Sequence, residues 1–283
     1  MLLTNNILNK KEGIPLVVDF HTHIFPNHIA AKTIQHLEQV GKIKAATDGS
    51  LSGLLQSMSE AGIDLSVVLP VVTKPSQFVS VNDYAAKING MDGIISFGGI
   101  HPDTSDYIRE LDVIKKLGLP GIKLHPDYQN TFIDDEKYVK IIRYALKLGL
   151  IITIHAGIDI GLPETVHCTP ERVKLLLRQV EGQNLGSPKI ILAHAGGYGC
   201  WDQVEDLLVG ENVLFDISYS FGHINIQQLK RIIGNHGSHR ILFATDCPWG
   251  SQKETLDMFY QLQLDTRDEQ QILSLNATKL LGL

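Results

Sequence analysis

The sequence has little cysteine and no long apolar segment. Its three cysteines, Cys168, Cys200 and Cys247, are widely spaced among 283 residues and form no Cys-x-x-Cys motif. This pattern argues against a disulfide framework and against a zinc ribbon. No uncharged apolar run is long enough to cross a bilayer, and the N-terminus lacks the basic-then-apolar order of a signal peptide. We therefore expect a cytoplasmic protein without a membrane partner.

The sequence also lacks a strong excess of charge of one sign. The net charge is −6 at pH 7, and no block of like charges occurs, so we expect no nucleic-acid partner. The sequence contains no internal repeat, no low-complexity tract and no linker rich in proline and serine. A single domain spanning residues 1–283 is the simplest interpretation, with residues 1–14 as an N-terminal extension.

What the sequence does contain is a regular alternation of two patterns. Short runs rich in β-branched residues are typical of parallel strands covered on both faces. Amphipathic segments such as 106–118, 135–149 and 169–182 lie between these runs, and each ends near a glycine, as helices commonly do. The eight predicted strands are 16–21, 65–72, 94–100, 120–125, 151–155, 189–194, 212–218 and 240–246.

Eight strand–helix units predict an α/β fold of the (β/α)₈ TIM-barrel type, which typically takes about 250 residues. A doubly wound open sheet is the alternative, but the Gly-x-Gly-x-x-Gly motif that it would need after the first strand is absent. Residues 24–60 form the longest excursion between a strand and a helix. We expect them to hold an extra helix or a lid over the barrel mouth.

Polar residues of the types that commonly serve as catalytic groups or metal ligands follow the predicted strands. Because the active sites of such barrels lie at the C-terminal strand ends, these side chains are expected to converge on one opening. A single histidine at a strand end is explained equally well as a turn cap, but separate caps need not choose the same strand end. The strand-end residues are His21, His23, His101, Lys123, His125, His155, His194, Asp216, Ser218 and Asp246.

Four of these residues suit a metal ion. His21 and His23 are two residues apart and so face the same side of a strand. With His155 and Asp246 they would supply three imidazoles and one carboxylate to a divalent ion, most simply Zn²⁺, with a position left open for water. Such an ion could lower the pKa of bound water to about 7. Asp246 could accept the proton of that water, and His194 would stand beside the metal as an acid, a base or a ligand to a second ion.

The motifs DFHTHIF, TIHAG, LAHAGG and FATDCPWG occur in this order along the chain. In this combination the sequence resembles the amidohydrolase superfamily, most closely the amidohydrolase 2 branch with its aminocarboxymuconate-semialdehyde decarboxylase-like enzymes. The resemblance runs from about residue 16 to residue 281. It implies a metal-dependent (β/α)₈ barrel that acts on C–N, C–O or C–C bonds of small molecules, usually with zinc. It also implies that His21, His23, His155 and Asp246 bind the metal and that His194 is catalytic.

Other residues are candidates for a second metal or for substrate binding. Lys123 occupies the level at which related binuclear enzymes carry a carboxylated lysine, so it would bridge two metals or hold a substrate carboxylate as an ammonium. We favour one ion and a plain lysine. His101 and His125, each followed by proline, either line the pocket or cap turns. Trp249 is expected to wall the mouth, and Arg172 is a candidate for binding an anionic group.

Three functions follow from these patterns. The first is a metal-dependent hydrolase in which activated water attacks a C–N or C–O bond of a small substrate that carries a carboxylate or carbonyl. The second is a non-oxidative decarboxylase or hydratase that uses the same metal site. The third, from a different class, is a non-catalytic protein that keeps a structural metal. The sequence does not separate the first two, and a homodimer is compatible with all three.

Overall fold

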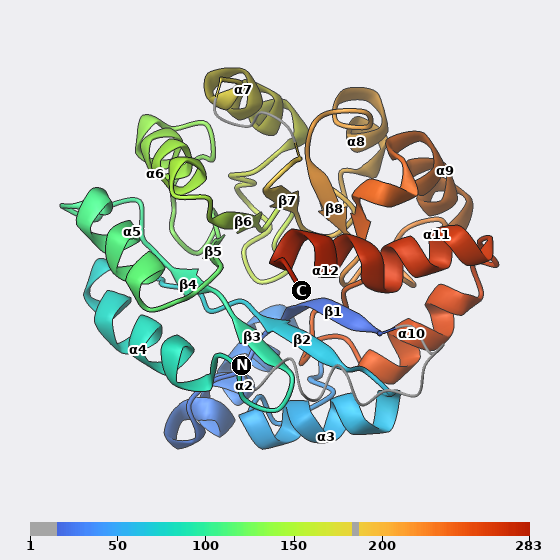
Figure 1. Cartoon of the computed structure of the whole chain (residues 1–283), viewed down its shortest axis with the longest axis horizontal. Helices are drawn as coiled ribbons and strands as arrows, with labels where there is room; N and C mark the ends of the chain where they lie inside the picture. Colours follow the sequence, from blue (N-terminus) through green and yellow to red (C-terminus); the bar gives the residue numbers. More distant parts are fainter. Residues whose placement is uncertain (1–15, 183–186) are drawn as a thin grey trace. The chain divides into compact units, whose positions relative to one another are not determined.

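The computed structural model of the chain describes residues 16–182 and 187–283 (Figure 1). The N-terminal extension predicted for residues 1–14 lies outside the described residues. The chain divides into two compact units. The first comprises Met1–Val68, Ile88–Ile95 and Asp216–Leu283, and the second comprises Leu69–Lys87 and Ser96–Phe215. No helix among the described residues combines the length and the apolarity that a membrane span requires.

The first unit contains the beginning and the end of the chain's strand series. β1 (Val18–Thr22), β2 (Leu65–Val68) and β3 (Ile94–Ser96) form a sheet in that order, and β1 runs parallel to β2 with Val18 opposite Leu65. The segment that follows β9 (Ile241–Leu242) lies against β1, because the Phe20 N–H donates to the Phe243 carbonyl at 2.9 Å. The ends of the first and last strands are therefore neighbours.

Six α-helices in the described part of this unit pack around these strands. They are α2 (Asn27–Gly41), α3 (Leu51–Ala61), α9 (Ile226–His236), α10 (Gln252–Tyr260), α11 (Thr266–Gln270) and α12 (Asn276–Leu281), with short turns η2 (Ser238–Arg240) and η3 (Gln271–Leu275). The long excursion 24–60 thus contains α2 and α3. α3 begins where the Ser50 hydroxyl accepts the Gly53 N–H, and it packs beside α10 (Figure 1).

The second unit carries parallel strands in chain order. β4 (Gly98–Gly99), β5 (Gly121–Leu124), β6 (Ile151–Ile154), β7 (Ile190–Leu192) and β8 (Leu214–Asp216) are each hydrogen-bonded to the next. Every residue of these strands is buried, as their continuous apolar sequences predict. The strands therefore point their C-terminal ends in one direction.

The connecting helices of this unit lie outside its strands (Figure 1). They are η1 (Pro75–Gln77), α4 (Phe78–Ile88), α5 (Tyr107–Lys116), α6 (Glu136–Lys147), α7 (Pro170–Val180) and α8 (Trp201–Leu207). α7 starts as its sequence predicts, because Thr169 caps the Arg172 N–H and Pro170 takes the first helical position. The predicted segments 106–118, 135–149 and 169–182 correspond to α5, α6 and α7.

All eight predicted strands are present, but the second and the last end earlier than predicted, at Val68 and Leu242, and the third is divided. The predicted run 94–100 forms β3 and β4, with Phe97 between them. At β4 the side chain of Asn82 takes up both backbone groups of Gly99, donating to its carbonyl and accepting its N–H. A side chain at Gly99 would also meet Val72, since a Cβ there would lie 2.7 Å from that residue.

Candidate functional site

The first unit brings three predicted metal ligands together. His21 lies on β1, His23 directly follows the end of that strand at Thr22, and Asp246 follows β9. The Nε2 atoms of the two histidines are 3.1 Å apart, and Asp246 Oδ1 lies 3.4 Å from Nε2 of His21 and 3.2 Å from Nε2 of His23. We call these three residues the first donor group. His21 is almost completely buried, and Asp246 is 8% exposed.

The spacing of this donor group fits a divalent ion. Ligand atoms arranged tetrahedrally around zinc at about 2.0–2.1 Å are separated from each other by about 3.3–3.4 Å. The three donor atoms, with spacings of 3.1 to 3.4 Å, match this value and consist of the nitrogen and carboxylate atoms that such ions prefer. With three protein ligands, the group leaves coordination positions for water or substrate.

Asp216 orients His21 through Nδ1, the ring nitrogen that is not part of the first donor group, and Ser218 in turn binds Asp216. Asp216 Oδ2 lies 2.9 Å from His21 Nδ1, and its other oxygen accepts the backbone N–H of Ser218 at 3.0 Å and the hydroxyl of Ser218. Because an ionised carboxylate only accepts, Nδ1 of His21 carries the proton and Nε2 keeps its lone pair. A carboxylate behind a ligating imidazole fixes the ring and makes it a stronger ligand.

Asp19 ties the two segments of this donor group together and is not itself among the donors. Its carboxylate accepts the Thr245 N–H at 3.0 Å, the Thr245 hydroxyl at 2.5 Å and the Gln252 amide at 2.7 Å. Complete burial raises the pKa of Asp19 to about 7. Asp19 therefore joins β1 to the segment after β9 through hydrogen bonds. Next to it, Asp246 donates its N–H to the His21 carbonyl at 2.8 Å and adopts a positive φ of 66°, a strained conformation found mainly at functional sites.

The residues after Asp246 divide between core and rim. Cys247 is completely buried, and burial raises the pKa of its thiol to about 12. The Trp249 N–H donates to the Asp246 carbonyl at 2.8 Å, and this residue is half-buried. The turn therefore fixes the backbone of Trp249 beside the donor group, while its role in walling the mouth stays a prediction.

The second unit holds another set of histidines and carboxylates. His125 follows β5 and His155 follows β6. Their rings stack with centroids 4.1 Å apart and an interplanar angle of 9°. Asp159 Oδ2 lies 3.5 Å from His125 Nε2 and 4.0 Å from His155 Nε2. We call His125, His155 and Asp159 the second donor group. Asp159 is a residue that the sequence analysis missed, because it lies in the loop after the strand and has no periodic signal.

His194 contacts this second donor group. Its Nε2 lies 3.1 Å from His155 Nδ1, and its backbone carbonyl accepts the indole N–H of Trp201 at 3.0 Å. His194 and Ala195 both have positive φ values, 60° and 55°. Two successive non-glycine residues keep this left-handed backbone conformation only because their surroundings hold them in it. The end of β7 thus presents His194 in one fixed orientation.

The remaining predicted residues of the second unit have diverse surroundings. Lys123 on β5 is 1% exposed. His101 accepts the Asp103 N–H at its Nδ1 at 3.1 Å, as a turn cap does, and burial lowers the pKa of its imidazole. Arg172 donates to Asp134 at 2.8 Å and lies 3.7 Å above the Phe132 ring. Its charge therefore has a protein partner, and its binding of an anionic ligand stays a prediction.

The predicted ligand His155 belongs to the second unit, so its membership in the ligand set of His21 and His23 stays a prediction. The position of His167 in the long loop after the fifth predicted strand predicts a solvated side chain, and this prediction is wrong. His167 is buried, and its Nδ1 and its backbone N–H each lie 3.0 Å from Oδ1 of Asp127. A neighbouring carboxylate in the turn after β5 offsets the cost of burying the imidazole.

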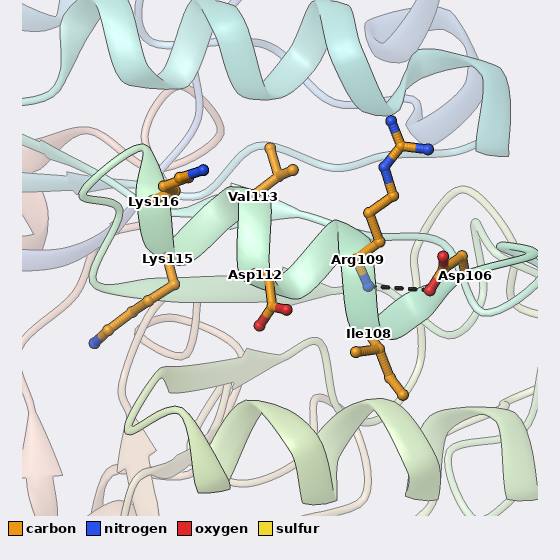
Figure 2. Close-up of a pocket in the computed structure, with 7 residues that line it drawn as sticks. All are labelled: Asp106, Ile108, Arg109, Asp112, Val113, Lys115 and Lys116. Carbon is orange, nitrogen blue, oxygen red and sulfur yellow. Dashed lines mark hydrogen bonds between the residues drawn. The ribbon is translucent and has the colours of Figure 1, made fainter.

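Figure 2 shows a hollow lined by seven residues of α5 and its N-terminal flank. Asp106 caps the helix there by accepting the Arg109 N–H at 3.0 Å. The lining contains charged side chains of both signs and no histidine, and it includes none of the predicted site residues. This hollow is a groove on the outside of a helix and offers no constellation for catalysis.

A model of the amidohydrolase family matches residues 18–283. The chain therefore belongs to the amidohydrolase family, as its four motifs indicate. No curated protein has a significant match to it.

Several solved structures are similar in fold. An uncharacterised TIM-barrel protein from Bordetella bronchiseptica has a TM-score of 0.76 at 17% identity, covering 94% of this chain and 98% of that chain. A 5-carboxyvanillate decarboxylase from Novosphingobium aromaticivorans, in complex with manganese and 4-hydroxy-3-methoxy-5-nitrobenzoic acid, has a TM-score of 0.69 at 16% identity (96% and 97% covered). A putative 2-pyrone-4,6-dicarboxylic acid hydrolase from Pseudomonas putida has a TM-score of 0.65 at 16% identity (95% and 98% covered).

The family and these similarities confirm the predicted (β/α)₈ fold class and an enzyme of the amidohydrolase superfamily. The family and the His/Asp donor groups together support a divalent metal as its cofactor. The manganese in one similar structure means that the expected preference for zinc has no support beyond the donor chemistry.

Proposed function

We propose that the protein is a divalent-metal-dependent decarboxylase of a small carboxylic acid. The observation that carries this proposal is the first donor group, in which His21, His23 and Asp246 place three donor atoms within 3.4 Å of one another. The sequence analysis listed hydrolysis first, although the sequence did not separate it from decarboxylation. The order is reversed here because a similar structure is that of a decarboxylase with manganese and an aromatic carboxylic acid.

The roles of the residues follow from their positions. A bound divalent ion would supply positive charge that holds and polarises substrate oxygens. His21, His23 and Asp246 would bind it, and Asp216 keeps Nε2 of His21 available as a ligand by accepting a hydrogen bond from Nδ1–H. In the proposed reaction, the bond between the substrate carbon and its carboxylate breaks, CO₂ leaves, and the carbon takes up a proton.

We assign this proton transfer to His194. Its imidazole is buried and contacts His155, and the indole N–H of Trp201 fixes its backbone by donating to the His194 carbonyl. A positioned imidazole that donates a proton contributes typically about 10²–10⁴-fold to a reaction rate. Lys123, if it remains an ammonium, is the candidate to pair with a substrate carboxylate as a point charge.

Hydrolysis is the second candidate. It is favoured by the hydrolase among the similar structures and by a donor group that leaves room for water. In that reaction an activated water would attack a lactone, ester or amide carbon, and Asp246 or His194 would carry the proton to the leaving group.

One pair of assays separates the two reactions. The metal-depleted protein is reloaded with Mn²⁺ or Zn²⁺ and incubated with a panel of hydroxybenzoic and β-keto acids, and released CO₂ is measured. A parallel panel of lactones, esters and amides reports hydrolysis. We expect CO₂ from at least one acid, and only with metal present. Turnover confined to the lactone, ester or amide panel would replace decarboxylation with hydrolysis, and CO₂ release that survives complete metal removal would contradict the metal dependence. The more active ion identifies the preferred metal.

A further inference from the structure

We propose that Tyr219, supported by His223, is a substrate-binding residue whose hydroxyl donates a hydrogen bond to an oxygen of a small acid held at the first donor group. The acid that this residue recognises carries a second oxygen group, such as a hydroxyl or a carbonyl, next to its carboxylate. The proposal rests on the metal site of the proposed function but not on the bond that is broken, because a hydrolase would bind its substrate with the same residue.

Tyr219 directly follows the residues that orient His21. The hydroxyl of Ser218 lies 3.1 Å from Nδ1 of His21 and donates to Asp216. Residues 213–218 and 220–221 are buried, whereas Tyr219 between them is half-buried. Tyr219 is therefore the one residue of this stretch that reaches the surface, and it does so next to a residue in contact with a proposed metal ligand.

The backbone of Tyr219 adopts a left-handed conformation, with a φ of 49°. Within the described ranges, the non-glycine residues with positive φ that come within four residues after a strand are His194, Ala195, Tyr219 and Asp246. A positive φ is a genuine outlier for a bulky side chain such as tyrosine. Strained residues of this kind gather at functional sites, and two of the set, His194 and Asp246, already have proposed roles there.

The loop after Tyr219 holds its ring in place. The Ser220 hydroxyl donates to the Ser218 carbonyl at 3.1 Å, and the carbonyl of Ser220 accepts the N–H groups of His223 and Ile224 at 3.1 and 3.0 Å. This turn brings the His223 ring against that of Tyr219, with centroids 4.8 Å apart and an interplanar angle of 22°. A stacked neighbour restricts the movement of the Tyr219 ring, so the hydroxyl at its edge is positioned before a ligand arrives.

The hydroxyl of Tyr219 has the properties of a donor. Burial, together with the negative charge of Asp246, raises its pKa. The hydroxyl therefore stays protonated at neutral pH and donates to an acceptor oxygen. Because the charge of Asp246 acts on it, the hydroxyl lies in the neighbourhood of the first donor group. A hydrogen bond to a charged oxygen of the substrate is stronger than one between neutral groups.

The test compares two acids that differ by one hydroxyl group. Salicylate and benzoate are titrated into the full-length protein loaded with Mn²⁺, and isothermal titration calorimetry gives the Kd of each. Tyr219→Phe removes the hydroxyl and keeps the ring. We expect the preference for salicylate over benzoate to fall by about 3–10-fold in Tyr219→Phe, the usual contribution of one hydrogen bond, with the same Mn²⁺ content as wild type.

Three further variants sharpen this test. Tyr219→Leu lacks both the ring and the hydroxyl and should lose at least as much preference as Tyr219→Phe. His223→Leu removes the stacked ring and should show a smaller loss. Tyr260→Phe is the matched control, since Tyr260 is 46% exposed on α10 of the same unit, and its preference should equal that of wild type. Thermal unfolding verifies that each variant is folded.

The contradicting results fall into two kinds. An unchanged preference in Tyr219→Phe and Tyr219→Leu would overturn the role of Tyr219 and leave the proposed function intact. Loss of bound Mn²⁺ in Tyr219→Phe would make this residue a support of the metal centre and would also overturn the proposal. Failure of the Mn²⁺-loaded wild type to bind either acid would instead contradict the proposed function itself, and the role of Tyr219 with it.

Discussion

The two units present histidines and carboxylates in different ways. In the first donor group the donor atoms are 3.1 to 3.4 Å apart, and Asp216 has a direct contact with the ligating His21. In the second, the spacings are 3.5 to 4.0 Å, and His155 contacts another imidazole, that of His194. A carboxylate partner strengthens an imidazole as a ligand, whereas contact between two imidazoles suits proton exchange. This difference supports the proposed division of roles, in which the first donor group binds the metal and His194 transfers the proton.

The largest effect is expected from breaking the first donor group. Asp246→Asn should abolish stoichiometric metal binding and lower turnover by about 10³-fold or more, since a bound ion supplies several kcal/mol of charge stabilisation. Elemental analysis and the substrate assays measure both quantities. A variant that retains one tightly bound ion and normal turnover would remove Asp246 from the metal centre.

A substitution in the second unit should separate turnover from metal binding. His194→Asn is expected to lower kcat by about 10²–10⁴-fold, the usual contribution of general acid–base catalysis, with the tight ion still bound. The plot of kcat against pH should lose the inflection that protonation of this histidine causes. If His194→Asn instead released the tightly bound ion, His194 would be a metal ligand and its role in proton transfer would be wrong.

A smaller effect is expected from the carboxylate behind His21. Asp216→Asn keeps the shape of the side chain but weakens the charge that orients the ring, so metal affinity should fall by about 10–100-fold. Competition with a chromogenic chelator measures that affinity. Ser218→Ala removes the hydroxyl that donates to Asp216 and lies 3.1 Å from His21 Nδ1. This variant serves as the graded control and should lie between wild type and Asp216→Asn. Equal affinity in all three proteins would show that Asp216 does not support the ligand.

The smallest effect is expected from Trp201→Phe. This change removes the N–H that donates to the His194 carbonyl at 3.0 Å while keeping an aromatic ring. The loss of one hydrogen bond of this kind costs about 0.5–1.5 kcal/mol, and we expect a comparable decrease in stability and a drop in kcat of up to about tenfold. Thermal unfolding and steady-state kinetics are the measurements. A changed KM with unchanged kcat would indicate that Trp201 contacts the substrate and does not position His194.

The sequence predicted the strands well because burial on both faces of a parallel sheet produces continuous apolar runs. It did not predict the division of the third strand, since this depends on Asn82, a residue of α4 that binds Gly99. Contacts between residues far apart in the chain leave no local pattern. The same limit applies to the site, where alternation along β1 indicated that His21 and His23 share a face.

The loop residues could not be found in this way. Asp127 and Asp159 follow strand ends at irregular distances, and the turn that carries Asp127 depends on hydrogen bonds from Gln129 to Val72 and Ile100. Asp216 was visible as a strand-end carboxylate, but its partner His21 lies 195 residues earlier in the chain. Pairing of that kind follows from the fold and not from spacing.

The most direct test of the account is the position of a bound ion. Crystals of the full chain grown with Mn²⁺ would give an anomalous difference map, in which we expect the strongest peak within bonding distance of Nε2 of His21, Nε2 of His23 and a carboxylate oxygen of Asp246. A strongest peak that has no contact with these three atoms would contradict the assignment of the metal centre.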